Sequence, residues 1–150
     1  MHLTDFFAAD AVSLDLGGTS KDDVLGALVG LLGLDPDARD TLVRLLQRRE
    51  ALGSTGVGRG IAIPHCRSLV VERLRLAYGH HPAGVEYQAI DNRPVHDFFL
   101  IVAPPLEISN QYLPVLGKIA QFAKEPDVPE RLARLVAPGE FLALLGEKGV

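Results

Sequence analysis

The chain predicts an α/β protein in which a small mixed β-sheet is flanked by helices. Apolar residues recur at helical spacing toward both ends of the 150 residues, whereas the middle holds short alternating or β-rich runs. The two kinds of pattern intermix along the chain, which is typical of an α/β domain. The length and a hydrophobic content of 47% suit a single domain over residues 1–150 with a packed core. These patterns leave the order of the strands open.

The first fifty residues predict one strand and two helices. Residues 11–16 alternate in a way that suits a short strand. Ser20 and Asp23 have the spacing of a capping box, so a helix is expected to begin there. Asp35 followed by Pro36 predicts the start of a second helix, because a cap precedes a proline whose missing amide needs no partner at that position. This second helix is expected to end near residue 50.

The next stretch is rich in glycine. Residues 53–60 contain four glycines in eight positions, which indicates a loop or a close approach of strands. Residues 61–63 form a short apolar run, predicted to be a buried strand. Pro64 keeps the residue before it extended, so His65 is expected just past the end of that strand.

The second half predicts two more strands and then helices. Residues 74–78 alternate as a strand does, and residues 95–102 are apolar and β-rich, as expected of a central strand. The adjacent His80 and His81 precede a proline and are interpreted as a turn. From Asn110 on a helix is predicted, with short helices expected near 129–135 and 138–145. The apolar positions that we expect on one face of the first of these helices are Leu113, Leu116, Ile119, Ala120 and Phe122.

Composition excludes several classes of protein. The formal net charge is −4 and no run of Lys and Arg is present, which argues against a nucleic-acid partner. No apolar segment reaches the roughly 20 residues that span a bilayer, and no secretory signal is visible, so direct membrane insertion is not expected. Cys66 is the only cysteine, which favours a reducing, cytoplasmic location.

His65 is the candidate catalytic residue, as the acceptor of a phosphoryl group. Neutral imidazole is a good nucleophile near pH 7. A phosphoryl group on it adds close to two negative charges, which backbone amides, hydroxyls or a guanidinium must stabilise. Such groups are candidates before and within the glycine-rich stretch: Arg49, Ser54, Thr55, Gly58 and Gly60. The segment matches neither a P-loop nor a dinucleotide-binding fingerprint.

Other chemistry is disfavoured. Cys66 beside His65 could make a thiol dyad or metal site, but neighbours on an extended chain point to opposite sides. The adjacent His80 and His81 diverge for the same reason, and no metal site is expected. His96 is interpreted as a structural residue of a strand. Asp91 and Asp97 could form an acid pair, but turn and strand roles are favoured.

Residues 49–65 read Arg-Glu-Ala-Leu-Gly-Ser-Thr-Gly-Val-Gly-Arg-Gly-Ile-Ala-Ile-Pro-His. This run resembles the phosphohistidine signature of the type-2 enzyme IIA family of the bacterial phosphotransferase system. That family serves fructose and mannitol uptake and includes the nitrogen-regulatory enzyme IIA proteins, whose Gly-Ser-Thr-Gly stretch looks most similar. The resemblance covers nearly the whole chain, including residues 12–25 and 89–95.

The resemblance implies the family's mixed sheet flanked by helices, and a phosphocarrier function. A phosphorylated HPr-like carrier would donate to His65 at Nε2, with phosphoenolpyruvate as the ultimate source through enzyme I. An enzyme IIB domain or a regulated target protein would be the next partner. In the family, an arginine at the position of Arg49 lies near the active histidine, and no cofactor, metal or nucleotide is bound.

Three positions depart from the family pattern. Most members keep a second histidine early in the helix after the central strand; Tyr112 aligns there, or Gln111 if the register slips by one. Tyrosine donates one hydrogen bond but cannot share a proton as imidazole does. The chain is therefore an active phosphotransferase component or a regulatory binding module with weak or lost transfer. Cys66 stands where glycine is usual, and Arg59 adds either a cation for phosphate or a solvated loop charge.

Overall fold

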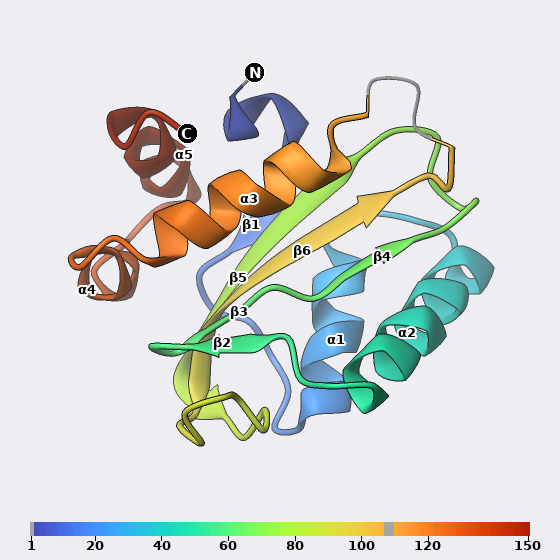
Figure 1. The fold of residues 1–150 in the computed structure, drawn as a ribbon, viewed down its shortest axis with the longest axis horizontal. Coiled ribbons are helices and arrows are strands. Elements are labelled where there is room, and N and C mark those ends of the chain that lie inside the picture. The colour runs from blue at the N-terminus through green and yellow to red at the C-terminus, as the bar shows by residue number, and fades with distance from the viewer. Residues whose placement is uncertain (1, 107–109) are drawn as a thin grey trace.

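The computed structural model describes residues 2–106 and 110–150, which fold into three layers. A mixed sheet forms the middle layer, with α1 and α2 on one face and α3, α4 and α5 on the other (Figure 1). The helices are η1 (Leu3–Phe6), α1 (Lys21–Gly30), α2 (Pro36–Ala51), α3 (Tyr112–Ala123), α4 (Val128–Ala133) and α5 (Pro138–Glu147). The strands are β1 (Phe7–Ser13), β2 (Gly56–Gly58), β3 (Ile61–Ala62), β4 (His65–Arg67), β5 (Arg75–Val85) and β6 (Val95–Ala103).

The sheet is organised around β6. Its order is β1-β5-β6-β3-β2, and β4 also pairs with β6. The β5–β6 and β2–β3 pairs are antiparallel, whereas β1 runs parallel to β5, and β3 and β4 run parallel to β6. The mixed sheet flanked by helices that the sequence predicts is therefore confirmed.

Strands β3 and β4 are two parts of one extended segment beside β6. Ala62 pairs with Phe98 and His65 with Ile101, so the register is kept across the gap. Pro64 lies in the gap and has no amide to donate, although its carbonyl accepts from the amide of Ile101 at 3.0 Å. His65 therefore begins a strand, rather than lying just past the end of one as predicted.

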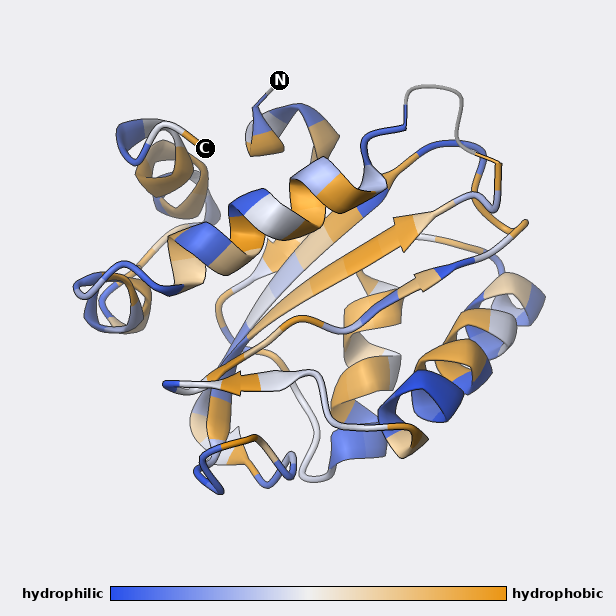
Figure 2. Cartoon of the chain, viewed as in Figure 1, coloured by the Kyte–Doolittle hydropathy of each residue, from blue (hydrophilic) through white to orange (hydrophobic). Residues whose placement is uncertain are grey.

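Side chains alternate between the two faces of the sheet, and each face has its own core. From β6, Phe99 and Ile101 pack toward α3, α4 and α5, whereas Phe98, Leu100 and Val102 pack toward α1 and α2. Strand β6 is hydrophobic nearly throughout, while hydrophilic residues gather on α2 and in the connecting segments (Figure 2). A strand buried on both faces explains why residues 95–102 form a nearly continuous apolar run.

The helix starts follow the predicted capping residues. The hydroxyl of Ser20 accepts from the amide of Asp23 at 3.1 Å, and the carboxylate of Asp35 accepts from the amide of Ala38 at 2.9 Å. Pro36 is the first residue of α2. Within the described residues, no helix is long and apolar enough to cross a membrane.

Three local predictions were wrong. The first strand begins at Phe7 and ends at Ser13, earlier than the predicted 11–16. His80 and His81 lie inside β5, with an irregularity before Val85, and not in a turn. Leu113 is 68% exposed, because α3 begins with Tyr112 and buries that side chain instead.

Candidate functional site

His65 lies half-buried near the end of the sheet where β6 finishes. Its Nδ1 lies 2.7 Å from the carbonyl oxygen of Ile63. Because a carbonyl oxygen only accepts, Nδ1 carries the proton, and Nε2 of the neutral ring keeps its lone pair. Within the described residues Nε2 has no hydrogen-bond partner, and no buried side-chain nitrogen there lacks one, so Nε2 faces solvent. The ring is thus prepared as a nucleophile at Nε2.

Tyr112, the first residue of α3, lies against His65. The two ring centroids are 6.2 Å apart and the planes are tilted by 57°. His65 and Ile63 lie on the α3 side of the sheet by strand alternation, which brings the imidazole to the start of that helix. Of the two residues that could align with the family's second histidine, Tyr112 is the one beside the His65 ring.

Burial raises the pKa of Tyr112 to about 12, and Cys66 acts in the same direction. The positive charges of Arg67 and Arg49 oppose this shift, so both guanidinium groups lie close enough to act on the phenol. The Tyr112 hydroxyl therefore stays protonated at neutral pH and can donate a hydrogen bond.

Arg67 is a site residue that the sequence interpretation missed. Its guanidinium carbon lies 4.3 Å from the centroid of the Tyr112 ring, and Nη1 donates to the carbonyl of Pro104 at 3.2 Å. Arg67 is exposed, and no carboxylate pairs with it in the described part of the chain. The signal was available, because residues two apart on a strand share a face and His65 and Arg67 are two apart.

Arg49 is held at the end of α2. Its Nη1 donates to the carbonyl of Gly53 at 2.9 Å, which ties the last turn of the helix to the glycine-rich segment. The positive charge of Arg49 also opposes the raised pKa of Tyr112, and a role of Arg49 beside His65 stays a prediction.

Ser54 and Thr55 anchor the segment after α2. The Ser54 hydroxyl donates to the carbonyl of Tyr87 at 2.8 Å. Thr55 is buried, and both its hydroxyl and its amide donate to the carboxylate of Glu50, the amide at 3.0 Å. Lys21 completes this cluster, with its ammonium 3.0 Å from the same carboxylate. These bonds use the two hydroxyls within the fold, so neither points a free donor at His65 as predicted.

Gly58 and Gly60 do not line the His65 site. Both have positive φ, 96° and 78°, and turn the chain between β2 and β3. The carbonyl of Gly60 accepts from the amide of Asp97, whereas His65 pairs with Ile101, four residues farther along β6. At about 3.3 Å per residue the separation along the strand is about 13 Å. The register of the sheet thus separates these glycines from His65 along β6, and their role in phosphate binding stays a prediction.

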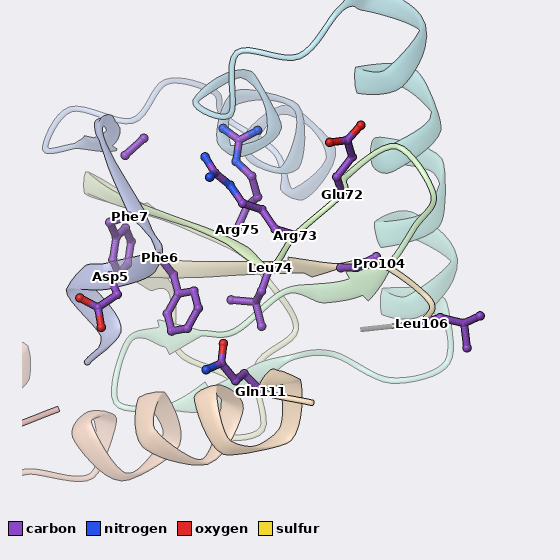
Figure 3. A pocket seen from close by; sticks show the side chains of 11 residues that line it. Asp5, Phe6, Phe7, Glu72, Arg73, Leu74, Arg75, Pro104, Leu106 and Gln111 are labelled. Atoms are coloured by element: carbon purple, nitrogen blue, oxygen red, sulfur yellow. The ribbon is translucent and has the colours of Figure 1, made fainter. Parts of the chain in front are cut away.

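Gln111 lines a neighbouring cavity instead of contacting His65. This cavity of about 560 Å³ lies between η1, the start of β5 and the end of β6. Figure 3 shows Gln111 beside it with Phe6 and Leu74. The cavity does not include His65, and no hydrogen bond joins Gln111 to the imidazole. The phosphate contact expected of Gln111 stays a prediction.

Cys66 and Arg59 have structural surroundings. Cys66 points to the α1 and α2 side, opposite to His65, and burial raises the pKa of its thiol to about 12. Arg59 donates to the carbonyls of Ala123 and Glu125, at 2.7 and 2.8 Å, at the end of α3. It stabilises a helix C-terminus, so its guanidinium is held by carbonyls instead of being an unbound loop charge.

The other histidines lie toward the opposite end of β5 and β6. His80 Nδ1 is 2.7 Å from the buried carboxylate of Asp97, which also accepts from the Tyr78 hydroxyl at 2.6 Å. His81 donates from Nε2 to the carbonyl of Gly18 and accepts the amide of Gly84 at Nδ1. His96 donates from Nδ1 to the carbonyl of His81. No group of three or more metal-ligating side chains gathers in the described residues.

The sequence of this chain matches known proteins over nearly its whole length. A family model described as "Phosphoenolpyruvate-dependent sugar phosphotransferase system, EIIA 2" matches residues 5–148. The nitrogen regulatory protein of Pseudomonas aeruginosa is 36% identical over 79% of this chain and 78% of its own length. The fructose-specific EIIA component of Haloferax volcanii is 30% identical over 82% of this chain and 80% of its own length.

A larger relative matches along only part of its length. The fructose-specific EIIABC component of Bacillus subtilis is 27% identical over 98% of this chain, yet the chain spans only 23% of that protein.

Solved structures agree with these matches. The nitrogen regulatory protein IIA-Ntr of Neisseria meningitidis superposes with a TM-score of 0.85 at 28% identity, over 94% of this chain and 97% of that one. The mannitol IIA of Escherichia coli shares the fold, with a TM-score of 0.74 at 22% identity over 92% of this chain and 97% of that one. The signature around His65, the match over residues 5–148 and the shared fold agree: the chain belongs to the type-2 enzyme IIA family of the phosphotransferase system.

Proposed function

We propose that this chain is a cytoplasmic phosphocarrier that accepts a phosphoryl group on Nε2 of His65 from an HPr-like carrier. The observation that carries this is the hydrogen bond from Nδ1 of His65 to the carbonyl of Ile63, which leaves an unpartnered lone pair at Nε2. The two cations near Tyr112, Arg49 and Arg67, supply the charge that a phosphoryl dianion needs.

The transfer forms one bond and breaks one bond. The lone pair of Nε2 attacks the phosphorus of the carrier's phosphohistidine, and the departing imidazole of the carrier keeps the electron pair of its nitrogen–phosphorus bond. Positive charge that develops on the His65 ring is stabilised by the Nδ1–H bond to Ile63. Tyr112 can donate its hydroxyl proton toward the phosphoryl oxygens.

The next partner is an enzyme IIB domain or a regulated target protein. One structure that shares this fold is a complex of the mannitol enzyme IIA with phosphorylated enzyme IIB from Escherichia coli, at 22% identity to this chain. The relatives named nitrogen regulatory protein favour the regulatory branch, since one of them is 36% identical.

A second candidate function is a regulatory binding module with weak or lost phosphotransfer. The observation that favours it is Tyr112 beside His65, where most of the family keeps a second histidine. A phenol with its pKa raised to about 12 donates a hydrogen bond but does not exchange its proton near neutral pH as imidazole does.

The test is phosphorylation of the purified chain by enzyme I, an HPr-like carrier and radiolabelled phosphoenolpyruvate. We expect acid-labile, base-stable label on the wild type, none on His65→Ala, and wild-type label on His2→Ala, which removes an exposed histidine elsewhere. Phosphorus NMR then distinguishes Nε2 from Nδ1 attachment. Equal label on His65→Ala would overturn the assignment of His65.

A rate measurement separates the two functions. In the relay function, phosphorylated protein passes its label to a cognate enzyme IIB domain within seconds. In the regulatory function, label is gained slowly or not at all, and Tyr112→His increases the rate of gain. A fast wild type that Tyr112→His does not accelerate would exclude the second function.

A further inference from the structure

We infer that Arg67, seated on the face of the Tyr112 ring, is a phosphate-binding residue for the phosphoryl group on His65. The inference rests on the proposed function, because it concerns the same phosphohistidine. It gives the Tyr112–Arg67 pair a role in phosphate binding. Tyr112 stands at the position where the family pattern has a second histidine.

Strand geometry places Arg67 on the side of the site. His65 pairs with Ile101 and Arg67 with Ala103, and both partners pack toward α3. Side chains two residues apart on a strand share a face, so His65 and Arg67 project to the same side of β4. The Cα atoms of such residues are separated by about 7 Å, within the reach of an arginine side chain.

Tyr112 contacts both side chains. Its ring lies 6.2 Å from the His65 centroid and 4.3 Å from the guanidinium carbon of Arg67. A guanidinium over an aromatic face is held by the ring quadrupole, which orients its N–H groups without using them. Tyr112 is only 8% exposed and is fixed in the first turn of α3, so the surface that supports Arg67 is rigid.

Arg67 keeps most of its hydrogen-bonding capacity. One nitrogen, Nη1, donates to the carbonyl of Pro104 at 3.2 Å, while a guanidinium carries five N–H donors. No carboxylate of the described residues neutralises it, in contrast to Lys148, which contacts Asp127 at 2.8 Å. An exposed arginine that has no acidic partner among the described residues, beside a nucleophilic histidine, suits a dianion that arrives only during the reaction.

The first test avoids any carrier protein. Wild type, Arg67→Ala, Arg67→Lys and Tyr112→Phe are phosphorylated on His65 with potassium phosphoramidate, and the phosphohistidine is titrated by phosphorus NMR. Loss of a neighbouring cation raises the pKa of the phosphoryl group, so we expect the Arg67→Ala titration to move up by about half a unit or more. Arg67→Lys keeps the charge but loses the planar stacking, so we expect the pKa of its phosphoryl group to lie between those of wild type and Arg67→Ala.

Tyr112→Phe keeps the ring that supports Arg67, so its titration stays closer to that of wild type than does that of Tyr112→Leu. The matched control is Arg134→Ala, which removes an exposed arginine from the end of α4 and leaves the titration unchanged. Circular dichroism checks that each variant is folded. An Arg67→Ala titration identical to that of wild type would overturn the inference.

The second test measures single-turnover transfer from a saturating phosphorylated HPr-like carrier. We expect Arg67→Ala to slow the transfer step about tenfold, because a donor is lost where charge develops. A change confined to the carrier concentration needed for half-maximal rate would instead assign Arg67 to docking and contradict the inference. If no carrier phosphorylates even the wild type, the proposed function fails, while the phosphoramidate titration still decides the role of Arg67.

Discussion

His65 and His80 lie beside opposite ends of strand β6, and each has a bonded Nδ1 but a different electrostatic environment. At one end, the Nδ1 of His65 bonds a neutral carbonyl, and the guanidinium of Arg67 stacks on the neighbouring Tyr112 ring. At the other, the Nδ1 of His80 bonds the carboxylate of Asp97 at 2.7 Å. A phosphoryl dianion would be attracted at the first end and repelled at the second. Under the proposed function, the charge around the ring, and not only the presence of a histidine, favours the His65 end for a phosphoryl group.

The largest effect is expected from removing His65. His65→Ala loses all phosphoryl label from either the carrier or phosphoramidate, whereas His80→Ala keeps it, because the carboxylate of Asp97 disfavours a dianion there. Mass spectrometry of the labelled wild-type protein under alkaline conditions locates the group. Comparable label on His80 would show that the local charge does not discriminate between the two ends.

The next largest effect concerns Cys66, the neighbour of His65 that faces the other side. Burial raises its pKa to about 12, so at pH 8 we expect iodoacetamide to alkylate it about a thousandfold more slowly than a free thiol. The same protein in urea supplies the control, since unfolding restores the ordinary thiol. Fast alkylation of the folded chain would mean that Cys66 is accessible and that the site end is more open than described.

Asp97→Ala tests the structural role of the His80 end. This variant leaves the buried Tyr78 hydroxyl and the half-buried His80 without their shared acceptor, which we expect to lower the free energy of unfolding by about 3 kcal/mol. Urea denaturation measures the loss. Phosphorylation of His65 should be retained in the folded fraction, and loss of labelling by that fraction would contradict the separation of a structural end from a reactive end.

A smaller effect is the pH dependence of stability. Between pH 9 and 12 the unfolded chain releases the Cys66 proton while the folded chain keeps it, so stability falls as pH rises through this window. At pH 11 we expect this residue to contribute a loss of about 3 kcal/mol. Cys66→Ala removes its part of the slope, and thermal unfolding from pH 8 to pH 11 compares the two proteins. If stability fell equally with pH in wild type and Cys66→Ala, the raised pKa of Cys66 would be refuted.

The smallest effect tests a link between the ends. Arg59 starts from the β2–β3 turn and donates to Ala123 and Glu125, at the far end of the helix that begins with Tyr112. We expect Arg59→Ala to cost about 1 kcal/mol of stability, because two helix carbonyls lose a charged donor. Arg134→Ala is the matched control. If folded Arg59→Ala protein were phosphorylated on His65 less than Arg134→Ala, α3 would transmit strain to the site.

Local sequence patterns predicted most of the elements but not their contacts. The capping residues Ser20 and Asp35 start helices as expected, because a cap acts on amides two or three residues away. Leu113 was assigned to the wrong face, since the exact rotation of a helix depends on what packs against it. His80 and His81 were interpreted as a turn because the following proline usually disrupts a strand, yet an irregularity in β5 accommodates it.

The candidate site divides in the same way. His65 and Arg49 were predicted from a contiguous signature, while Gly58 and Gly60 belong to that signature but lie about 13 Å along the sheet from His65. Glycines that are adjacent in sequence to a histidine separate from it when the chain between them is extended. Arg67 was not predicted as a site residue, although its two-residue spacing from His65 was a usable signal, and its contact with Tyr112 required the packing of α3 on the sheet.

The sequence by itself determined the family, the fold class and the histidine, because periodicity, caps and the run 49–65 are all local properties of the chain. The tertiary structure decided which side chains surround that histidine. It tied Ser54 and Thr55 into the fold, directed Arg59 to the end of α3, and brought Tyr112 and Arg67 to His65. The reason is physical: hydrogen bonds and ring contacts depend on distances between elements, which the strand register and helix packing set and no local pattern contains.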